Sequence, residues 1–167
     1  MKGFILSLLS FLGIASTGEP IKEGQPAYRF ALYSDEGKIE KLENYTGRWV
    51  VLYFYPKADT PGCTVQAKEY TKLMPAFEKA NIKVFGISTD SVEAIRKFKE
   101  KYQQKVTFLS DPKGQVARAY GVTVIAGFCS RDTVIVNPQG MVEKIYRGVD
   151  PASDPHQVLQ YITSKKS

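Results

Sequence analysis

Cysteine and histidine are scarce in this sequence: its 167 residues include two cysteines, Cys63 and Cys129, and one histidine, His156. The positions three residues before and after Cys63 are Thr60 and Gln66, so the chain has no C-x-x-C pair there. This excludes a dithiol exchange centre at Cys63. A lone histidine is weak evidence for a metal ligand, and we therefore expect no metal site.

Internal repeats, linkers and low-complexity segments are also absent. With 167 residues, of which 43% are hydrophobic, the chain is long enough for one well-buried domain and too short for two. The formal net charge is +6, but the basic residues are mixed with acidic ones, as in RKFKEKYQQK at residues 96–105. That pattern is typical of a solvated helix face. Since aromatic-basic platforms and zinc spacings are lacking as well, we expect no nucleic-acid partner.

The N-terminus departs from this mixed pattern, because Lys2 is followed by an uncharged, apolar-rich stretch over residues 3–15. The stretch is shorter than the ~20 apolar residues that span a bilayer, so we expect no stable membrane association. It suits the apolar region of a secretory signal, with small residues before a cleavage site. The sequence predicts a signal peptide at 1–17, a single domain at 18–167, and export to the periplasm or secretion. A buried N-terminal helix or a short uncleaved anchor is the alternative to the signal peptide, and a cytoplasmic location is the alternative to export.

Beyond this segment, strands and helices are predicted in alternation. A turn signal at residues 35–37 lies between two short strands, which predicts a β-hairpin at the start of the domain. The almost wholly apolar run at residues 49–55 is typical of a central strand buried on both faces. The predicted strands are 28–32, 38–42, 49–55, 82–88, 106–111, 132–137 and 141–148, and helices are predicted after Cys63 and at 91–102, 115–121 and 155–164. This order predicts a single α/β sheet with helices on both faces.

Two local signals concern the helices. Apolar residues recur at helical spacing after Cys63, but Pro75 predicts that this helix is kinked or split. Asp90 and Glu93 have the three-residue spacing of a capping box, which predicts that Asp90 caps the next helix.

Cys63 lies just past the C-terminal end of the predicted central strand, at the first turn of the following helix. Ligands collect at the carboxyl ends of strands in α/β sheets, and the free N–H groups and dipole of a helix N-terminus favour a thiolate over a thiol. Thr60 can direct a hydroxyl at a molecule that approaches the sulfur, and Pro56 can shield the pocket from water without offering a competing donor. The alternative is that Cys63 is a small buried apolar residue beside a simple Pro-Gly turn.

Residues 56–63, PKADTPGC, fit the P-x-x-x-T-x-x-C signature of peroxiredoxins. The longer run YFYPKADTPGCTVQA resembles the bacterioferritin-comigratory, or peroxiredoxin Q, branch of that family almost residue for residue, and the similarity continues through GISTDS, FLSDPKGQVARAYGV and SRDTVIVNPQG. The resemblance implies a thioredoxin-like fold, with a central mixed β-sheet flanked by helices. It also implies an enzyme that reduces hydrogen peroxide and organic hydroperoxides without a metal, flavin or other cofactor.

The chemistry of such a site can be assigned to individual groups. A thiolate at Cys63 attacks a peroxide oxygen and becomes a sulfenic acid. The hydroxyl of Thr60 and the backbone N–H groups of Gly62 and Cys63 can donate hydrogen bonds to the departing oxygen. Arg131 is similar to the family's active-site arginine, which holds the thiolate and polarises the peroxide. Without the surrounding motif, Arg131 would be interpreted as a surface arginine.

The sulfenic acid then has to be reduced, and here the sequence departs from its relatives. Many members of the branch carry a second cysteine five residues after the first, but this chain has Lys68 there, and residues 91–102 contain no cysteine. Cys129 remains: in an extended segment its side chain points the same way as that of Arg131, toward the pocket, or else it is a buried apolar residue. We favour a one-cysteine mechanism in which thioredoxin, glutaredoxin or a small thiol reduces Cys63.

Two other classes of protein remain as alternatives: a secreted thioredoxin-like thiol–disulfide oxidoreductase and a non-catalytic binding domain of the same fold. The first needs the C-x-x-C pair that this chain lacks. The second has no need for a complete set of proline, threonine, cysteine and arginine. We also expect the protein to be a monomer or a weak dimer.

Overall fold

The computed structural model describes residues 19–166. The signal peptide predicted at residues 1–17 therefore lies outside the described residues. Within the described range, no helix combines the length and the apolar character needed to cross a membrane.

A seven-stranded sheet forms the centre of the described chain. Its strands are β1 (Ala31–Ser34), β2 (Ile39–Lys41), β3 (Trp49–Phe54), β4 (Ile82–Ser88), β5 (Thr107–Ser110), β8 (Thr133–Val136) and β9 (Val142–Tyr146), and β6 (Val124–Ile125) and β7 (Phe128–Cys129) form a separate pair. The order across the sheet is β2-β1-β5-β4-β3-β8-β9. β3, β4 and β5 are parallel to one another, whereas β1 and β8 are antiparallel to their neighbours β5 and β3. The sheet is therefore mixed, and β1 and β2 form the expected N-terminal hairpin.

β3 lies in the interior of the sheet because both of its faces are apolar. Val51 and Tyr53 pack in a core cluster on one face, and Val50, Leu52 and Phe54 pack in a cluster on the other. A strand that is hidden from water on both faces needs hydrogen-bonding partners at both edges. β4 and β8 supply these partners, so the central strand predicted from the sequence is confirmed.

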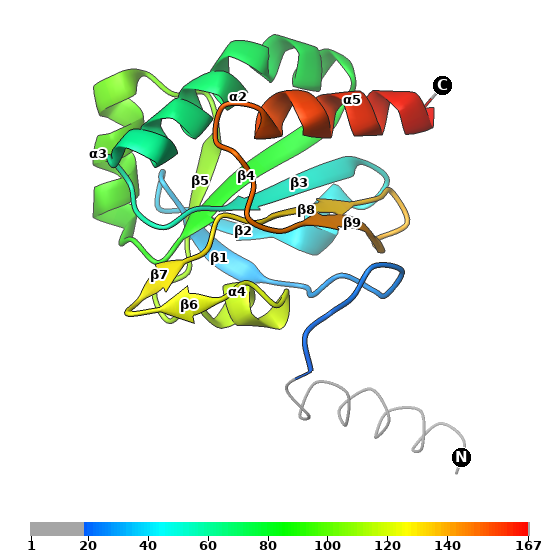
Figure 1. The fold of residues 1–167 in the computed structure, drawn as a ribbon, viewed down its shortest axis with the longest axis horizontal. Coiled ribbons are helices and arrows are strands. Elements are labelled where there is room, and N and C mark those ends of the chain that lie inside the picture. The colour runs from blue at the N-terminus through cyan, green and yellow to red at the C-terminus, as the bar shows by residue number, and fades with distance from the viewer. Residues whose placement is uncertain (1–18, 167) are drawn as a thin grey trace.

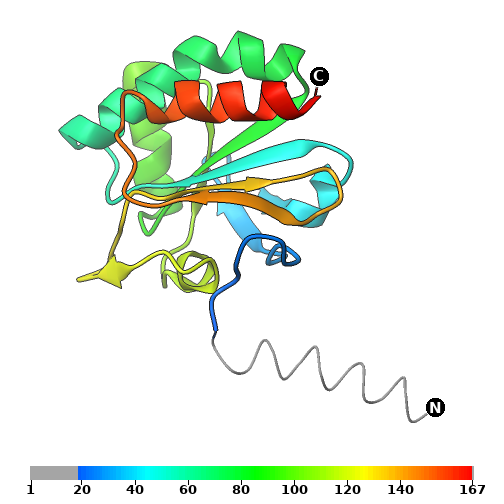
Figure 2. The same ribbon diagram turned by 45° about the vertical axis from the view of Figure 1, so that its right-hand side comes forward.

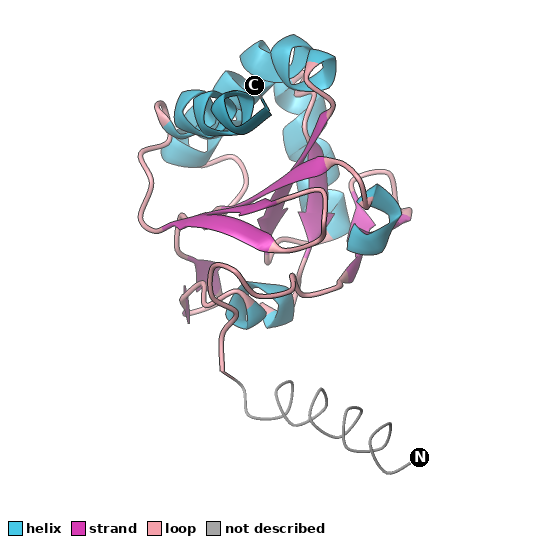
Figure 3. Ribbon diagram, turned by 90° about the vertical axis from the view of Figure 1, so that its right-hand side faces the viewer, coloured by secondary structure: helices cyan, strands magenta, loops and turns pink. Residues whose placement is uncertain are grey.

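Long helices cover one face of the sheet: α2 (Pro61–Lys79), α3 (Val92–Tyr102) and α5 (Asp154–Lys166). Figures 1 and 2 show α2 and α5 side by side over the strands. The shorter α4 (Gln115–Ala119) and the 3-10 helix η1 (Leu42–Tyr45) contribute to the cluster on the other face. Figure 3 shows the strands between the layer of long helices and a short helix on the opposite side. The prediction of an α/β sheet with helices on both faces is confirmed.

Of the two outcomes predicted at Pro75, a kink or a split, the split does not occur, because α2 continues through this residue. A proline inside a helix costs about 3 kcal/mol, through a lost hydrogen bond and a clash with the preceding turn. Tyr70, Met74 and Phe77 on the same helix are buried against the sheet. Burial of large apolar side chains stabilises a structure by roughly 1.5–3 kcal/mol each, which is enough to hold the helix together across the proline.

The predicted cap of α3 is also corrected. The helix is capped by Ser91, whose Oγ accepts a hydrogen bond of 3.1 Å from the Ala94 N–H. The carboxylate of Asp90 instead accepts hydrogen bonds of 2.8 Å from the Ala58 N–H and from Ser88 Oγ. This carboxylate therefore connects the end of β4 to the loop that follows β3, and does not cap the helix.

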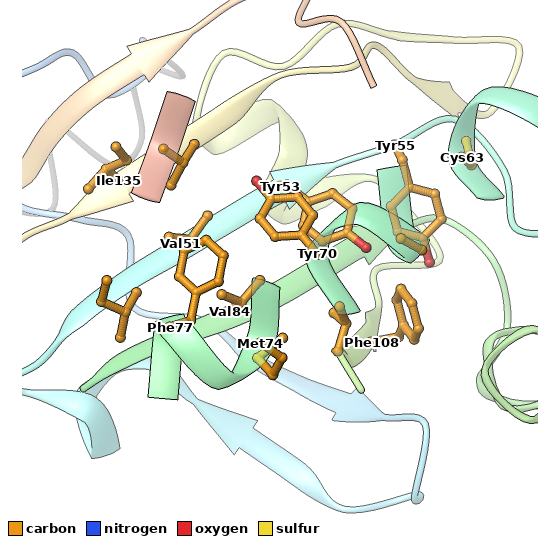
Figure 4. Close-up of a cluster of buried hydrophobic side chains, with 14 of the residues drawn as sticks. Val51, Tyr53, Tyr55, Cys63, Tyr70, Met74, Phe77, Val84, Phe108 and Ile135 are labelled. Carbon is orange, nitrogen blue, oxygen red and sulfur yellow. The ribbon is translucent and has the colours of Figure 1, made fainter. Parts of the chain in front are cut away.

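Aromatic rings fill the core between the sheet and α2. The rings of Tyr53 and Tyr70 stack with their centroids 4.3 Å apart and their planes 16° apart. Figure 4 shows this pair, with Tyr55 and then Cys63 toward one end of the cluster. Tyr55 and Cys63 are 1% and 2% exposed. The sulfur thus lies where the buried aromatic core reaches the first turn of α2.

Candidate active site

Cys63 lies in the first turn of α2, at the C-terminal end of the central strand, where the sequence predicts it (Figure 4). Thr60 has an extended backbone and is the residue at which the helix begins. Pro61 occupies the first helical position. An N–H group at this position has no partner within the helix, so proline loses no hydrogen bond there, and its fixed φ suits the helix. The Thr-Pro-Gly-Cys run therefore places the sulfur one turn from the end of the helix.

Two backbone N–H groups at this helix end, those of Gly62 and Cys63, have no acceptor among residues 19–166. The first hydrogen bond of the helix runs from the Thr64 N–H to the Thr60 carbonyl, at 2.8 Å. Free amides at a helix N-terminus present both donors and the positive end of the helix dipole. They can therefore stabilise negative charge on the sulfur or on an oxygen beside it.

Arg131 brings a positive charge to the same sulfur. Its Nη1 lies 3.5 Å from Cys63 Sγ and donates a hydrogen bond of 2.8 Å to Gln66 Oε1. Arg131 lies two residues before β8, and because β8 is antiparallel to β3, the start of β8 lies at the C-terminal end of β3. The sheet topology therefore brings together two residues that the sequence separates by 68 positions.

The approach of Arg131 depends on Gly62. A Cβ atom at this position would lie 2.8 Å from Arg131 Nη2, which is closer than real Cβ contacts allow. The missing side chain lets the guanidinium lie across the first turn of α2. The sequence points to Gly62 for its backbone N–H, and the structure adds this steric reason for a glycine.

The Thr60 hydroxyl is expected from the sequence to donate a hydrogen bond to the substrate, but in the structure it can only accept one. Its Oγ1 donates a hydrogen bond of 2.7 Å to the Lys57 carbonyl, so the hydroxyl proton is used inside the loop. The oxygen keeps its lone pairs and can accept a hydrogen bond, for example from the O–H of a hydroperoxide. Pro56 is half-buried just before this loop and has no N–H to offer.

The loop between β3 and α2 is held at two further points. The Ala58 N–H donates to Asp90, and the Asp59 carboxylate accepts hydrogen bonds from Lys101 Nζ at 2.8 Å and Tyr102 Oη at 2.6 Å. These two hydrogen bonds, that from Lys101 first, lower the pKa of Asp59. Sequence reasoning missed this attachment to the end of α3, because no local pattern connects the two segments.

Behind Arg131 lies a buried polar cluster that sequence reasoning also missed. Gln66 Nε2 donates a hydrogen bond of 3.0 Å to Asp154 Oδ2. The same oxygen accepts hydrogen bonds from Tyr70 Oη at 2.6 Å and Thr133 Oγ1 at 3.0 Å. Asp154 is 1% exposed, and burial raises the pKa of its carboxyl. Gln66 could have been found, since it follows Cys63 by one helical turn, whereas Asp154 gave no local signal.

Cys129 lies in β7, in the separate pair of strands β6 and β7. It is 2% exposed and packs in the core cluster on the opposite face of the sheet from the cluster that contains Cys63. Burial, helped by the negative charges of Asp111 and Asp90, raises the pKa of Cys129 to about 12. Both cysteines are free thiols. Cys129 is therefore a buried thiol that is protonated at neutral pH, and a resolving role stays the less favoured of its two alternatives.

The lone histidine has no metal-binding surroundings in the described chain. His156 lies in the first turn of α5, with Nε2 3.8 Å from Glu69 Oε2. Between residues 19 and 166, no three His, Cys, Asp or Glu side chains are grouped so that they could hold a metal ion.

Comparison with known proteins shows relatives along most of the chain. Residues 23–145 match the model of the AhpC/TSA family. Peroxiredoxin Bcp of Escherichia coli strain K12 is 34% identical over 150 residues, which cover 86% of this chain and 96% of that protein.

Solved structures are similar to the fold described above. A mutant of PrxQ from Xylella fastidiosa superimposes with a TM-score of 0.83 at 25% identity, over 89% of this chain and 99% of that one. The bacterioferritin comigratory protein of Xanthomonas campestris, studied for its alkyl peroxide reduction activity, superimposes with a TM-score of 0.78 at 30% identity, over 83% of this chain and 92% of that one.

Proposed function

The chain belongs to the AhpC/TSA family and is a peroxiredoxin, a thiol-dependent peroxidase, and we propose that Cys63 is the residue that reacts with its peroxide substrate. The observation that carries this assignment is the 3.5 Å approach of Arg131 Nη1 to Cys63 Sγ. The sulfur also lies at a helix N-terminus with two free N–H groups. A guanidinium and a helix N-terminus both favour the thiolate, which is the nucleophilic form of cysteine.

The reaction at this site is a displacement at oxygen. The Cys63 thiolate attacks the terminal oxygen of a hydroperoxide, so that an S–O bond forms and the O–O bond breaks. The sulfur is oxidised to a sulfenic acid, and the peroxide is reduced. The departing oxygen carries both electrons of the broken bond, takes up a proton, and leaves as water or an alcohol.

The groups around Cys63 match the charge that this displacement moves. Negative charge passes from the sulfur to the departing oxygen, so donors must serve both positions. The free N–H groups of Gly62 and Cys63, in the first turn of α2, and the guanidinium of Arg131, which reaches that turn from the start of β8, are these donors. Thr60 Oγ1 can accept the hydrogen bond of the hydroperoxide O–H and thereby orient it. Pro56 supplies an apolar wall beside these donors.

We assign the reduction of the sulfenic acid to an external thiol: thioredoxin, glutaredoxin or a small thiol. Residue 68, where many relatives carry the second cysteine, is a lysine here, and α2 contains no cysteine besides Cys63. The Nζ of Lys68 lies 4.9 Å from the centroid of the Tyr102 ring. Cys129 is buried in the opposite cluster with a pKa of about 12, and a protonated thiol is a poor nucleophile. Both observations favour a mechanism with one reacting cysteine.

The substrates that we propose are hydrogen peroxide and organic hydroperoxides. The similarity to the Xanthomonas campestris protein, whose alkyl peroxide reduction has been studied, supports the second class. A thiol–disulfide oxidoreductase or a non-catalytic binding domain is not favoured, because the relatives are peroxiredoxins and the C-x-x-C pair is lacking. Thus the peroxide reaction is the function to test.

Replacement of Cys63 by serine tests the assignment. Serine is nearly isosteric with cysteine but is not ionised at neutral pH, so Cys63→Ser should keep the fold and lose the peroxide reaction. Stopped-flow measurement of peroxide consumption, with hydrogen peroxide and with an alkyl hydroperoxide, is the measurement. Cys129→Ser is the matched control and should react at close to the wild-type rate. A wild-type rate in Cys63→Ser would reject the assignment.

We also propose that the protein is exported. The support is in the sequence: Lys2, the short apolar stretch at residues 3–15 and the small residues after it have the order of a secretory signal. Residues 1–20 fused to a reporter that is active only outside the cytoplasm should give activity. Leu8→Arg, which interrupts the apolar stretch, is the control and should abolish it. A silent wild-type fusion would indicate a cytoplasmic enzyme.

A further inference from the structure

We propose that Asp154 is a positioning residue for the peroxide reaction: it fixes the side-chain amide of Gln66, and Gln66 in turn holds the guanidinium of Arg131 at Cys63. The proposal rests on the function assigned to Cys63 above. The connection consists of three contacts, from Asp154 Oδ2 to Gln66 Nε2 at 3.0 Å, from Gln66 Oε1 to Arg131 Nη1 at 2.8 Å, and from Nη1 to Cys63 Sγ at 3.5 Å.

The orientation of the Gln66 amide decides whether Arg131 has a partner. An amide has one accepting oxygen and one donating nitrogen, whereas a guanidinium only donates. With its nitrogen toward Asp154, Gln66 presents its oxygen to Arg131. The reversed amide would direct N–H groups at the guanidinium and an oxygen at the carboxyl. Asp154 therefore selects the orientation in which Arg131 is bound.

The selection holds in either protonation state of Asp154. Its Oδ2 already accepts hydrogen bonds from Gln66, Tyr70 and Thr133. Its Oδ1 is buried and has no hydrogen-bond partner in the described chain. A proton taken up by this carboxyl, whose pKa is raised by burial, would bind Oδ1 and leave Oδ2 as the acceptor. The Gln66 amide therefore keeps its orientation.

Asp154 is well placed to hold Gln66 still. It is the first residue of α5, it is 1% exposed, and its partners come from α2 and from β8. Gln66 is 0% exposed. Moving a buried, hydrogen-bonded amide is costly, because it leaves a donor unpaired in a place that water does not reach. The amide is thus fixed by three secondary-structure elements.

Arg131 depends on this fixed amide. Its side chain is only partly buried, and Gln66 Oε1 is the one oxygen acceptor that its guanidinium has among residues 19–166. An arginine side chain has many rotamers, and confining it to one of them costs free energy. A rigid acceptor on the same helix as Cys63 confines the guanidinium before the peroxide arrives, and so contributes to its preorganisation.

The first test compares two replacements of Asp154. Asp154→Asn keeps a carbonyl oxygen that can occupy the place of Oδ2, so its rate constant with hydrogen peroxide should stay close to wild type. Asp154→Leu keeps the branched shape of aspartate, although it is larger, and has no acceptor, so its rate constant should fall about tenfold to a hundredfold, as expected for a misplaced catalytic group. Equal rate constants for the two variants would overturn the proposal.

Asp154→Leu also leaves two hydroxyls unpaired, which disfavours the fold. A background with Tyr70→Phe and Thr133→Val removes those hydroxyls and leaves the Gln66 contact in place. The background alone should react at close to the wild-type rate, because in the described chain neither hydroxyl bonds to Arg131 or Cys63. Addition of Asp154→Leu to it should give the full loss. A slow background, or a fast triple variant, would indicate that Asp154 is only structural.

A double-mutant cycle separates action through Gln66 from general destabilisation. Gln66→Leu should slow the reaction about as much as Asp154→Leu, and the two changes together should be no slower than Gln66→Leu alone. If the rate constant of the double variant fell by the product of the two single losses, Asp154 would act by a route that does not include Gln66.

A second readout does not require peroxidase activity. In a Cys129→Ser background, iodoacetamide labelling of Cys63 at a series of pH values gives the midpoint at which the reactive thiolate forms. Asp154→Leu should move this midpoint to higher pH, while Asp154→Asn and Thr133→Val should not. If the wild-type protein failed to reduce any peroxide, the proposed function would fall, but these midpoints would still decide whether Asp154 positions Arg131.

Discussion

Arg131 Nη2 lies 2.8 Å from the point that a Cβ atom on Gly62 would occupy. The guanidinium and the first turn of α2 are therefore in contact because residue 62 has no side chain. The neighbouring Cys63 and Gln66 are buried in the core, at 2% and 0% exposure, so the helix cannot easily move away. An added methyl group has to displace the guanidinium instead.

Gly62→Ala should therefore slow the peroxide reaction without unfolding the protein. We expect a fall of about tenfold or more, because displacement of a catalytic group by ~1 Å is enough for such a loss. Stopped-flow kinetics gives the rate constant, and far-UV circular dichroism checks the fold.

Gly47→Ala is the control for Gly62→Ala. Gly47 has φ +94° and no heavy atom within 4 Å of the point that a Cβ atom would occupy, so alanine there strains the backbone without touching Arg131. It should lower the free energy of unfolding by about 1 kcal/mol and leave the rate constant unchanged. If Gly62→Ala behaved in the same way, the contact with Arg131 would have no part in the reaction.

Arg131→Met should slow the peroxide reaction more strongly. Methionine keeps part of the apolar side chain but removes the only group that combines a contact to the sulfur with a positive charge in the described site. Loss of one preorganised donor to developing charge costs about 3 kcal/mol, or roughly a hundredfold in rate. The exposed Arg118 provides the control, and Arg118→Met should react at the wild-type rate. Equal rates in both variants would mean that the pocket has been assigned to the wrong arginine.

Thr60→Val tests the hydroxyl that the loop orients. Valine has nearly the shape of threonine but offers no lone pairs to a hydroperoxide O–H, and it releases the Lys57 carbonyl from its 2.7 Å hydrogen bond. We expect a fall in rate of at least about tenfold, measured as above. Thr60→Ser keeps the hydroxyl and should retain most of the rate. A slow Thr60→Ser would point to the methyl group, and thus to packing, as the reason for threonine.

Much of the fold can be predicted because its strands carry strong apolar patterns. The strand predicted at residues 82–88 forms β4 with the same limits, and the run at 49–55 differs from β3 by one residue. The local predictions that are wrong, a split of the helix at Pro75 and a helix cap at Asp90, concern single residues whose behaviour depends on tertiary contacts. Packing against the sheet holds α2 together across the proline, and the Asp90 carboxylate accepts a hydrogen bond from the Ala58 N–H in the loop after β3.

The site can be predicted as far as its motif extends. Cys63, Thr60 and Gly62 lie within one short run, and the resemblance extends this set to Arg131, which the sheet brings to the sulfur. Asp154 could not be found, because it reaches Gln66 across 88 positions of the sequence. A buried carboxyl on a C-terminal helix has no spacing that marks it in a sequence, so only the packing of α5 on α2 reveals its partners.

The raised pKa of Cys129 makes a prediction about pH. Burial raises this pKa from 9.0 to about 12, which means that the folded protein holds the proton over a range in which the unfolded chain has lost it. The stabilisation from this thiol is complete below about pH 9 and is lost as the pH rises toward 12. Wild-type stability should fall more steeply over this interval than that of Cys129→Ala, as measured by urea unfolding.

Cys129 should also remain unmodified in the folded protein when Cys63 reacts. Iodoacetamide attacks thiolates, so at pH 8 it should add once, at Cys63, and a second time only after the protein is unfolded. Peptide mass mapping identifies the labelled residue. Labelling of Cys129 in the folded protein would show that its segment opens to solvent.

The product of one equivalent of peroxide separates the two routes of reduction. If Cys63 reacts alone, the protein should gain the mass of one oxygen and form an adduct with dimedone, which traps sulfenic acids. Cys129→Ala should then turn over with thioredoxin or a small thiol at nearly the wild-type rate. If Cys129 resolves the sulfenic acid, the protein should instead lose two hydrogens as a disulfide forms, which requires the two Cα atoms to come within about 7 Å. The two cysteines pack in core clusters on opposite faces of the sheet, and Cys129 is protonated at neutral pH. We therefore expect the dimedone adduct, and a Cys63–Cys129 disulfide found by peptide mapping would reject the one-cysteine mechanism.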